Sequence, residues 1–310
     1  MSTFLIYDPA YLKHDTGVHP ENGRRLEAIL DALEEDESVS KKLVRTAPRP
    51  ARNEDIARCH REDLIYEIES LCKRDESFID ADTRISPQSF DVARLAAGAA
   101  LAAVDMAMGE EGGHSFALIR PPGHRATIST AMGFCLFNNA AIGARYAQLK
   151  FGVERVLIID WDVHHGNGTQ EIFWDDPSVF YFSTHQYPYY PGTGSSGERG
   201  GGKGEGYTLN IPLAAGTSAR HHRQAFTDAL HEIEQKFPPD LIIISAGFDS
   251  RRGDPLGGLM LEDPDFYEMT KEVLRLADKH AAGRVIGLLE GGYNLDLLGK
   301  SVKSHISALL

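Results

Sequence analysis

Short runs of consecutive apolar residues recur along the chain, and segments of helical length separate most of them. Since the runs do not alternate apolar with polar positions, both faces of the strands that they predict should be buried, as in a parallel sheet. The clear runs are residues 4–7, 116–119, 156–159, 179–182, 241–244 and 285–289, and a weaker candidate spans residues 207–213.

Helical patterns occupy most of the intervals between these runs. The pair Ser86-Pro87, which is typical of a helix start, precedes an alanine-rich run to Met108. Further helices are predicted over residues 138–150, 218–236, 265–282 and 295–310. Strands that alternate with helices over the whole length predict an α/β fold in a single domain, residues 1–310, with a mostly parallel sheet.

Composition narrows the class of protein. Of the 310 residues, 42% are hydrophobic and 25% are charged, so the chain can form a large core and is not expected to be disordered. No stretch approaches the roughly 18–20 apolar residues of a membrane span, and the first residues lack the pattern of a signal peptide. We therefore expect a cytoplasmic protein whose three cysteines, Cys59, Cys72 and Cys135, are reduced thiols.

The net charge of −13 bears on the partners. A negative surface repels nucleic-acid phosphates and anionic lipids, so neither nucleic acid nor membrane is expected to bind. Cationic or neutral partners, including a basic protein tail, remain compatible with this charge. The sequence leaves the oligomeric state open.

Polar side chains directly follow four of the predicted strands. In an open parallel sheet, ligands bind beyond the carboxyl ends of the strands, so these side chains are expected to converge on one site. The four segments are Arg120-Pro121-Pro122-Gly123-His124, Asp160-Trp161-Asp162-Val163-His164-His165-Gly166, Ser245-Ala246-Gly247-Phe248-Asp249 and Glu290-Gly291-Gly292-Tyr293-Asn294.

The second of these segments has the spacing of a metal site. Residues two apart in an extended chain point to the same side, so Asp160, Asp162 and His164 can line one face. Carboxylate oxygen and imidazole nitrogen suit zinc, and Asp249 would complete a three-ligand site with open positions for water and substrate. Such open positions are typical of a catalytic zinc site, whereas the alternative is a surface turn with scattered charge.

Two other residues have ordinary structural explanations when each is considered alone. His124 follows Pro-Pro-Gly, where a histidine is often only a loop residue bonded to the backbone. Tyr293 follows Gly-Gly, where a tyrosine is often only a packing residue. Their position at the ends of predicted strands is what makes them candidates for the site.

A series of motifs extends over nearly the whole chain in a fixed order. They are His19-Pro20-Glu21, Asp80-Ala81-Asp82-Thr83, Arg120-Pro121-Pro122-Gly123-His124, Gly133-Phe134-Cys135-Leu136-Phe137-Asn138-Asn139, Asp160-Trp161-Asp162-Val163-His164-His165-Gly166-Asn167-Gly168, Tyr189-Tyr190-Pro191-Gly192-Thr193-Gly194, Ser245-Ala246-Gly247-Phe248-Asp249, Gly253-Asp254-Pro255-Leu256-Gly257-Gly258 and Glu290-Gly291-Gly292-Tyr293-Asn294. This series resembles the zinc-dependent histone deacetylase family, and its form resembles the class II branch and its bacterial members. The resemblance implies the arginase–deacetylase fold, an eight-stranded mostly parallel sheet flanked by helices.

The resemblance also implies roles for individual residues. One zinc ion per chain would be held by Asp162, His164 and Asp249. Asp160 would accept a hydrogen bond from His124 and fix its tautomer, and Tyr293 would donate to the substrate carbonyl oxygen. The reaction implied is hydrolysis of an amide whose carbonyl is bound to zinc, with removal of acetyl or other acyl groups from lysine side chains of proteins or peptides or from small amines.

Two further sites follow from the resemblance alone. A narrow apolar channel for an extended acyl-amine side chain would have walls formed by Phe134 and Tyr190 and a rim at Leu256. A structural potassium ion would lie beside the zinc. Its ligands would be the Ser183 hydroxyl and the backbone carbonyls of Asp160, Asp162, His164 and Thr184.

Arg125 departs from the family pattern, which has a second histidine after His124. Arginine cannot act as a base, because its pKa stays above about 12 and it has no acceptor. Three hypotheses follow: His124 performs both proton transfers; the protein is a slow hydrolase, or one suited to esters and activated acyl groups; or it is a pseudoenzyme that binds acylated ligands. Arg125 itself is either a loop residue turned outward or a clamp for a substrate carboxylate.

Two alternative functions are less well supported. An arginase-type site with two manganese ions needs a further aspartate near position 166, where this chain has Gly166. A preference for acetylated polyamines is compatible with the negative charge, but Leu256 supplies no carboxylate at the channel rim to select a distal amine.

Overall fold

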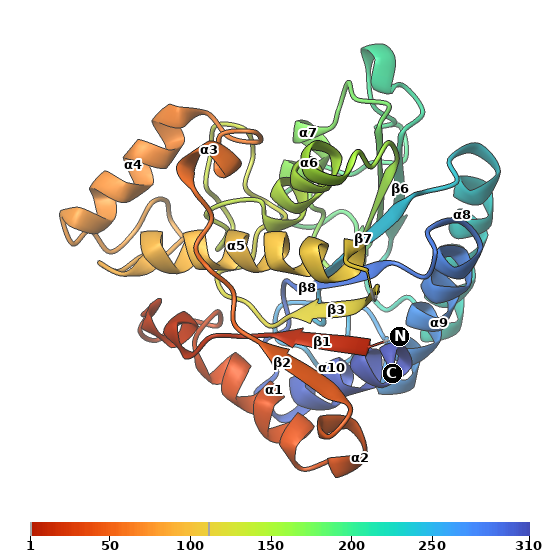
Figure 1. The fold of residues 1–310 in the computed structure, drawn as a ribbon, viewed down its shortest axis with the longest axis horizontal. Helices are drawn as coiled ribbons and strands as arrows, with labels where there is room; N and C mark the ends of the chain where they lie inside the picture. Colours follow the sequence, from red (N-terminus) through yellow and green to blue (C-terminus); the bar gives the residue numbers. More distant parts are fainter. Residues whose placement is uncertain (1, 111) are drawn as a thin grey trace.

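The computed structural model describes residues 2–110 and 112–310, and an all-parallel sheet forms the centre of that part of the chain (Figure 1). Its strand order is β2-β1-β3-β8-β7-β4-β5-β6, and each strand runs parallel to its neighbours. The strands are β1 Ser2–Ile6, β2 Leu43–Thr46, β3 Gly113–Ala117, β4 Val156–Asp160, β5 Val179–Gln186, β6 Thr208–Leu213, β7 Leu241–Ala246 and β8 Val285–Leu289.

Helices cover both faces of the sheet. In Figure 1, α5 and α6 lie on one side of the strands, and α1 and α10 lie on the other. The α-helices are α1 Arg24–Glu34, α2 Glu37–Ser40, α3 Asn53–Ile56, α4 Glu62–Lys73, α5 Ser89–Met108, α6 Asn139–Phe151, α7 Asn167–Ile172, α8 Ala219–Lys236, α9 Asp263–His280 and α10 Leu295–Leu309, and short 3₁₀ helices span Pro9–Lys13 and Gly202–Gly204. None of the helices in residues 2–110 and 112–310 is long and apolar enough to cross a membrane.

The burial of the central strands confirms the prediction drawn from their apolar runs. Every residue of β4, β7 and β8 is buried, because helices cover both faces of these strands. The α/β class and the eight-stranded sheet are therefore confirmed, and the sheet is parallel throughout the described residues rather than mostly parallel.

Three element predictions were wrong in detail. The edge strand β2 was missed, because it has only four residues and half of them are exposed. The strand predicted over residues 116–119 is β3, which begins and ends earlier, at Gly113–Ala117. The long helix predicted before this strand begins at Ser89 rather than at Ser86-Pro87, because the Ser89 hydroxyl accepts a hydrogen bond from the backbone N–H of Ser86 and closes a turn there.

The two ends of the described chain lie together at the amino edge of the sheet (Figure 1). Thr3, in β1, donates a hydrogen bond of 2.7 Å from its hydroxyl to the carbonyl of Leu309, the last residue of α10. The loops that follow the strands lie at the opposite, carboxyl edge. Because β3, β8, β7 and β4 are neighbours in the sheet, the loops after these four strands meet at one place.

Candidate active site

Three potential metal ligands converge beyond β4 and β7. The Nδ1 atom of His164 lies 3.1 Å from Oδ1 of Asp162 and 3.1 Å from Oδ2 of Asp249. The second oxygen of each carboxylate is held by the backbone: Gly291 donates to Asp162, and Val163 donates to Asp249, both at 2.8 Å. Backbone donors thus fix both carboxylates and leave one oxygen of each facing His164.

The local sequence leaves no room for side chains around these carboxylates. A Cβ atom at Gly291 would overlap the carboxylates of Asp249 and Asp162, and one at Gly247 would overlap Asp162. The glycines therefore permit the backbone to pass directly behind the ligand oxygens. The nitrogen lies 3.1 Å from each of the two oxygens, close to the ligand separation of roughly 3.3 Å expected around a tetrahedral zinc ion with ligand bonds of about 2.0–2.1 Å.

The charges of this cluster are strongly coupled. Burial raises the pKa of a carboxyl group, but the neighbouring His124, His164 and Arg125 hold the pKa of Asp162 well below its usual range. Burial and the charge of Asp162 raise the pKa of Asp249. Burial lowers the pKa of His164, but hydrogen bonds to both carboxylates outweigh it and raise that pKa. A cation held between the two carboxylates is thus favoured, and a divalent metal ion would replace the imidazole proton.

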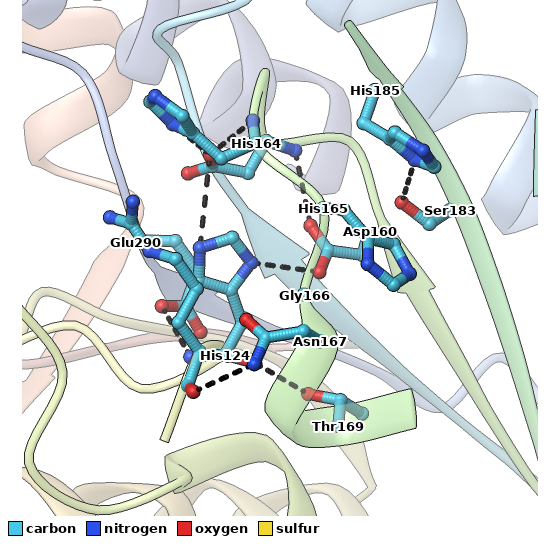
Figure 2. Close-up of polar contacts among 12 residues, drawn as sticks. His124, Asp160, His164, His165, Gly166, Asn167, Thr169, Ser183, His185 and Glu290 are labelled. Atoms are coloured by element: carbon cyan, nitrogen blue, oxygen red, sulfur yellow. Dashed lines mark hydrogen bonds and ion pairs between the residues drawn. The ribbon is translucent and has the colours of Figure 1, made fainter. Parts of the chain in front are cut away.

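His124 and Asp160 form a fully buried pair (Figure 2). Oδ2 of Asp160 lies 2.9 Å from Nδ1 of His124 and accepts a further hydrogen bond from the Tyr181 hydroxyl. Nε2 of His124 has no hydrogen-bond partner among the described residues and lies 3.8 Å from Oδ1 of Asp162. Burial lowers the pKa of His124, but the carboxylates of Asp160, Asp162 and Glu290 outweigh it and raise the pKa to about 9.

Tyr293 is held from two sides by residues to which the sequence analysis assigned no role. The carboxylate of Asp254 accepts a hydrogen bond of 2.7 Å from the backbone N–H of Tyr293. The guanidinium of Arg25 lies 4.9 Å from the centre of the tyrosine ring and donates to the carbonyls of Gly292 and Glu290. The Tyr293 hydroxyl is buried and unpartnered within the described residues.

Glu290 is a third supporting residue that was missed. One oxygen of its buried carboxylate accepts hydrogen bonds from the backbone N–H groups of Gly123 and His124, and so positions the loop that carries His124 (Figure 2). Glu290 and Asp254 lie inside the motifs quoted above, so a polar residue at a strand end or before Pro-Leu-Gly-Gly was an available signal. Arg25 lies at the start of α1, where no sequence pattern distinguishes it.

Two of the three expected channel residues lie beside residues of the site. The ring of Phe134 meets that of Tyr293 edge-on at 5.8 Å, and the ring of Tyr190 lies 6.3 Å from that of His164. Leu256 is half-buried, and its backbone carbonyl accepts a hydrogen bond from the Tyr189 hydroxyl. Tyr189, which was not assigned a role, stacks on His164 at 5.4 Å.

Arg125 points into the site. Its side chain is buried, and its guanidinium carbon lies 5.2 Å from the centre of the Phe134 ring. The hypothesis of a loop residue turned outward is therefore wrong. Asn167, at the start of α7, faces Arg125 only through the backbone, since its amide nitrogen lies 3.5 Å from the Arg125 carbonyl.

The residues expected around potassium lie next to the metal ligands. Ser183 in β5 pairs in register with Asp160 in β4. Its hydroxyl lies 2.9 Å from Nδ1 of His185 (Figure 2), and the hydroxyl of Thr184 lies 2.9 Å from Nε2 of His222. These two hydroxyls therefore already have partners within the protein.

A buried cluster of two carboxylates and an imidazole at the carboxyl edge of a parallel α/β sheet is a donor set of the kind found in metal-dependent hydrolases. Comparison with known proteins narrows this class: the histone deacetylase domain matches residues 19–309, and the chain belongs to the histone deacetylase family. The expectation drawn from the motifs is confirmed.

Relatives and solved structures agree with this assignment. A "Probable deacetylase" of Archaeoglobus fulgidus is 42% identical over 298 residues, which are 96% of this chain and 82% of that protein. A "Histone deacetylase-like amidohydrolase" of Pseudomonas aeruginosa is 37% identical over 276 residues, which are 89% of this chain and 72% of that protein. The crystal structure of the HDA15 HD domain superposes with a TM-score of 0.94 at 37% identity, over 99% of this chain and 88% of that one.

Proposed function

We propose that the protein is a zinc-dependent amidohydrolase that removes acetyl or other acyl groups from lysine side chains or small amines. The observation that carries the proposal is the convergence of His164 Nδ1 with one oxygen each of Asp162 and Asp249. The buried Tyr293 hydroxyl, which has no partner among the residues that the structure describes, supports it. Membership of a deacetylase family supports hydrolysis of amides, and the donor set suits a single zinc ion.

Different side chains of the protein would perform different steps of amide hydrolysis. Zinc bound at this site polarises a carbonyl group and lowers the pKa of water. Tyr293 would donate a hydrogen bond to the substrate oxygen as negative charge develops there. His124 would take the proton of the attacking water at Nε2 and return it to the leaving amine, while Asp160 holds Nδ1 and stabilises the imidazolium form.

In this proposal His124 performs both proton transfers, because Arg125 stands where the family pattern has a second histidine. Its buried guanidinium also supports a second candidate, a protein that binds acylated ligands without turnover, because loss of one acid–base group costs about 10²–10⁴-fold in rate. The proposal also includes residence in the cytoplasm and a structural potassium ion. The potassium ion would be bound by the Ser183 hydroxyl and the backbone carbonyls of Asp160, Asp162, His164 and Thr184.

A substrate panel tests the proposed function. The purified protein, loaded with zinc, would be assayed on acetyl-lysine and trifluoroacetyl-lysine peptides, acetylputrescine, acetylspermidine and aryl esters, with Asp249→Ala as the blank. Turnover of any amide above the blank supports the hydrolase. Turnover of esters or trifluoroacetyl groups only would show that protonation of the leaving amine is deficient. No turnover by a protein that still binds one zinc ion would favour the ligand-binding protein.

A further inference from the structure

Arg125 occupies the space where the acyl channel was expected. Its guanidinium carbon lies 5.2 Å from the ring centre of Phe134 and 5.5 Å from that of Tyr190, within cation–π distance of both. Its side chain is 2% exposed. The positive charge therefore lies between the two aromatic side chains, on the route toward the metal ligands.

The loop around residue 133 packs directly against the Arg125 side chain. Gly133 and Phe134 both adopt left-handed backbone conformations, with φ of 56° and 73°. A Cβ atom at Gly133 would lie 2.8 Å from both Cδ and Nε of Arg125. Only glycine permits this close approach. The packing of the loop against Arg125 therefore holds the side chain in its inward position.

The guanidinium lacks the partners that a buried arginine normally has. Its Nε and Nη2 atoms are buried and without a hydrogen-bond partner in the described chain. These two atoms form one edge of the guanidinium fork, which matches the two oxygens of a carboxylate. By contrast, the similarly buried Arg120 places Nε and Nη2 on the two oxygens of Glu21.

Neighbouring carboxylates do not fill this role. Asp162 and Asp249 lie close enough to interact with the charge of Arg125, but their oxygens are directed at His164 and at backbone N–H groups. The charge of Arg125 also acts on Asp82, where it lowers the pKa of the carboxyl group against the larger effect of burial. Asp82 nevertheless forms no ion pair with Arg125 in the part of the chain that is described. The Cys135 thiol also lies beside the guanidinium, but burial raises the pKa of this thiol to about 12, so it stays neutral. Once a divalent ion balances Asp162 and Asp249, the charge of Arg125 is therefore left over.

We propose that Arg125 binds a carboxylate carried by the substrate, so that the enzyme prefers acyl amides with a carboxylate a few bonds from the scissile amide. This inference rests on the proposed hydrolase, whose substrate class it names. The carboxylate belongs either to the acyl group, as in a succinyl amide, or to the amine, as in an N-acyl amino acid. A neutral acetyl-lysine chain leaves the guanidinium unpaired, so it is the poorer substrate.

A binding measurement tests the role of Arg125 without turnover. Succinate and butyrate would be titrated calorimetrically into the zinc-loaded protein, since they have equal chain length and only succinate has a second carboxylate. Charge-assisted hydrogen bonds favour succinate by about tenfold or more. Arg125→Met removes this preference, and Arg125→Lys, which keeps the charge but loses the fork, retains part of it. Arg155→Met, at the amino edge of the sheet where Arg155 pairs with Asp240, leaves it unchanged.

Kinetic pairs then locate the carboxylate. Succinyl-lysine peptide is compared with butyryl-lysine peptide, and N-acetylglycine with N-propylacetamide, again with Asp249→Ala as the blank. A higher kcat/KM for the charged member of one pair, lost in Arg125→Met, supports the inference and identifies the carrier. Equal affinity of the wild type for succinate and butyrate overturns it, even if the variants fail to fold. Turnover without any carboxylate preference overturns the inference alone, whereas a succinate preference with no turnover overturns the hydrolase and keeps Arg125 as an anion-binding residue.

Discussion

The Nδ1 atom of His124 lies 2.9 Å from Oδ2 of Asp160, and neither side chain is exposed to solvent. Because Asp160 accepts a hydrogen bond from the Nδ1–H group of His124, Nε2 carries the free lone pair or the second proton of the ring, and Nε2 faces Asp162. The pair therefore determines which nitrogen of His124 exchanges protons at the site.

Asp160→Asn is expected to lower kcat by about 10–100-fold while zinc stays bound, because the amide no longer fixes the tautomer of His124. Burial lowers the pKa of His124 and the Asp160 charge raises it, so loss of that charge lowers the pKa from about 9. If neutral His124 is the base, the acidic limb of the kcat profile moves to lower pH. The exposed Asp278→Asn is the control; an unmoved limb would contradict this assignment.

Arg125→His is expected to raise the rate on neutral acetyl-lysine peptides by about 10²–10⁴-fold, because it supplies a second acid–base group beside His124. The measurement is kcat/KM on an acetyl-lysine peptide, with Arg125→Gln as the matched variant that removes the charge without supplying a base. An equal rise in both variants would mean that the guanidinium hinders substrate entry rather than replaces a base.

Asp249→Ala is expected to abolish tight zinc binding, because it removes one of three ligands and leaves His164 with a single carboxylate partner. Metal content after dialysis, measured by mass spectrometry, should fall from about one ion per chain to a small fraction. Asp296→Asn, in the first turn of α10, controls for loss of charge. Full retention of zinc in Asp249→Ala would place the metal elsewhere.

Tyr293→Phe is expected to reduce kcat by about 10²–10³-fold with little change in metal content or in the free energy of unfolding, because the buried hydroxyl has no partner within the described protein. Single-turnover rates on the best amide substrate would measure the effect. Tyr267→Phe, on the exposed side of α9, is the matched control. Undiminished turnover in Tyr293→Phe would exclude the hydroxyl from the reaction.

Acid is expected to destabilise the fold through buried neutral histidines. Burial lowers the pKa of His305 from 6.5 to about 3, so the unfolded chain binds a proton in this window that the folded chain does not. The free energy of unfolding therefore falls as the pH drops below about 6.5. His305→Gln should lose about 2 kcal/mol less than the wild type between pH 7 and 5, measured by urea unfolding, whereas the exposed His231→Gln should behave as the wild type. Equal pH dependence of all three proteins would contradict the assignment to His305.

The fold and the metal cluster were predictable because both depend on patterns that are local in sequence. Continuous apolar runs reveal strands that are buried on both faces, and polar residues directly after them mark the carboxyl edge of the sheet. The edge strand β2 lacks such a run, since two of its four residues face solvent.

The supporting residues were harder to predict because they act over long separations. Arg25 reaches the carbonyls of Glu290 and Gly292 from the other end of the chain, and nothing in the residues around it signals that contact. The inward direction of Arg125 depends on how tightly Gly133 and Phe134 pack against it. The sequence alone did not show whether Arg125 points outward or into the site, because tertiary packing decides its direction.

The contact between Thr3 and Leu309 has a practical consequence for handling the protein. Since both ends of the described chain meet at the amino edge of the sheet, a short linker would join them, and a circular permutant could be opened in the glycine-rich surface loop near Gly202. A reporter or affinity domain fused at either end would likewise sit across the sheet from the metal ligands, where it neither shields the substrate entrance nor competes for it.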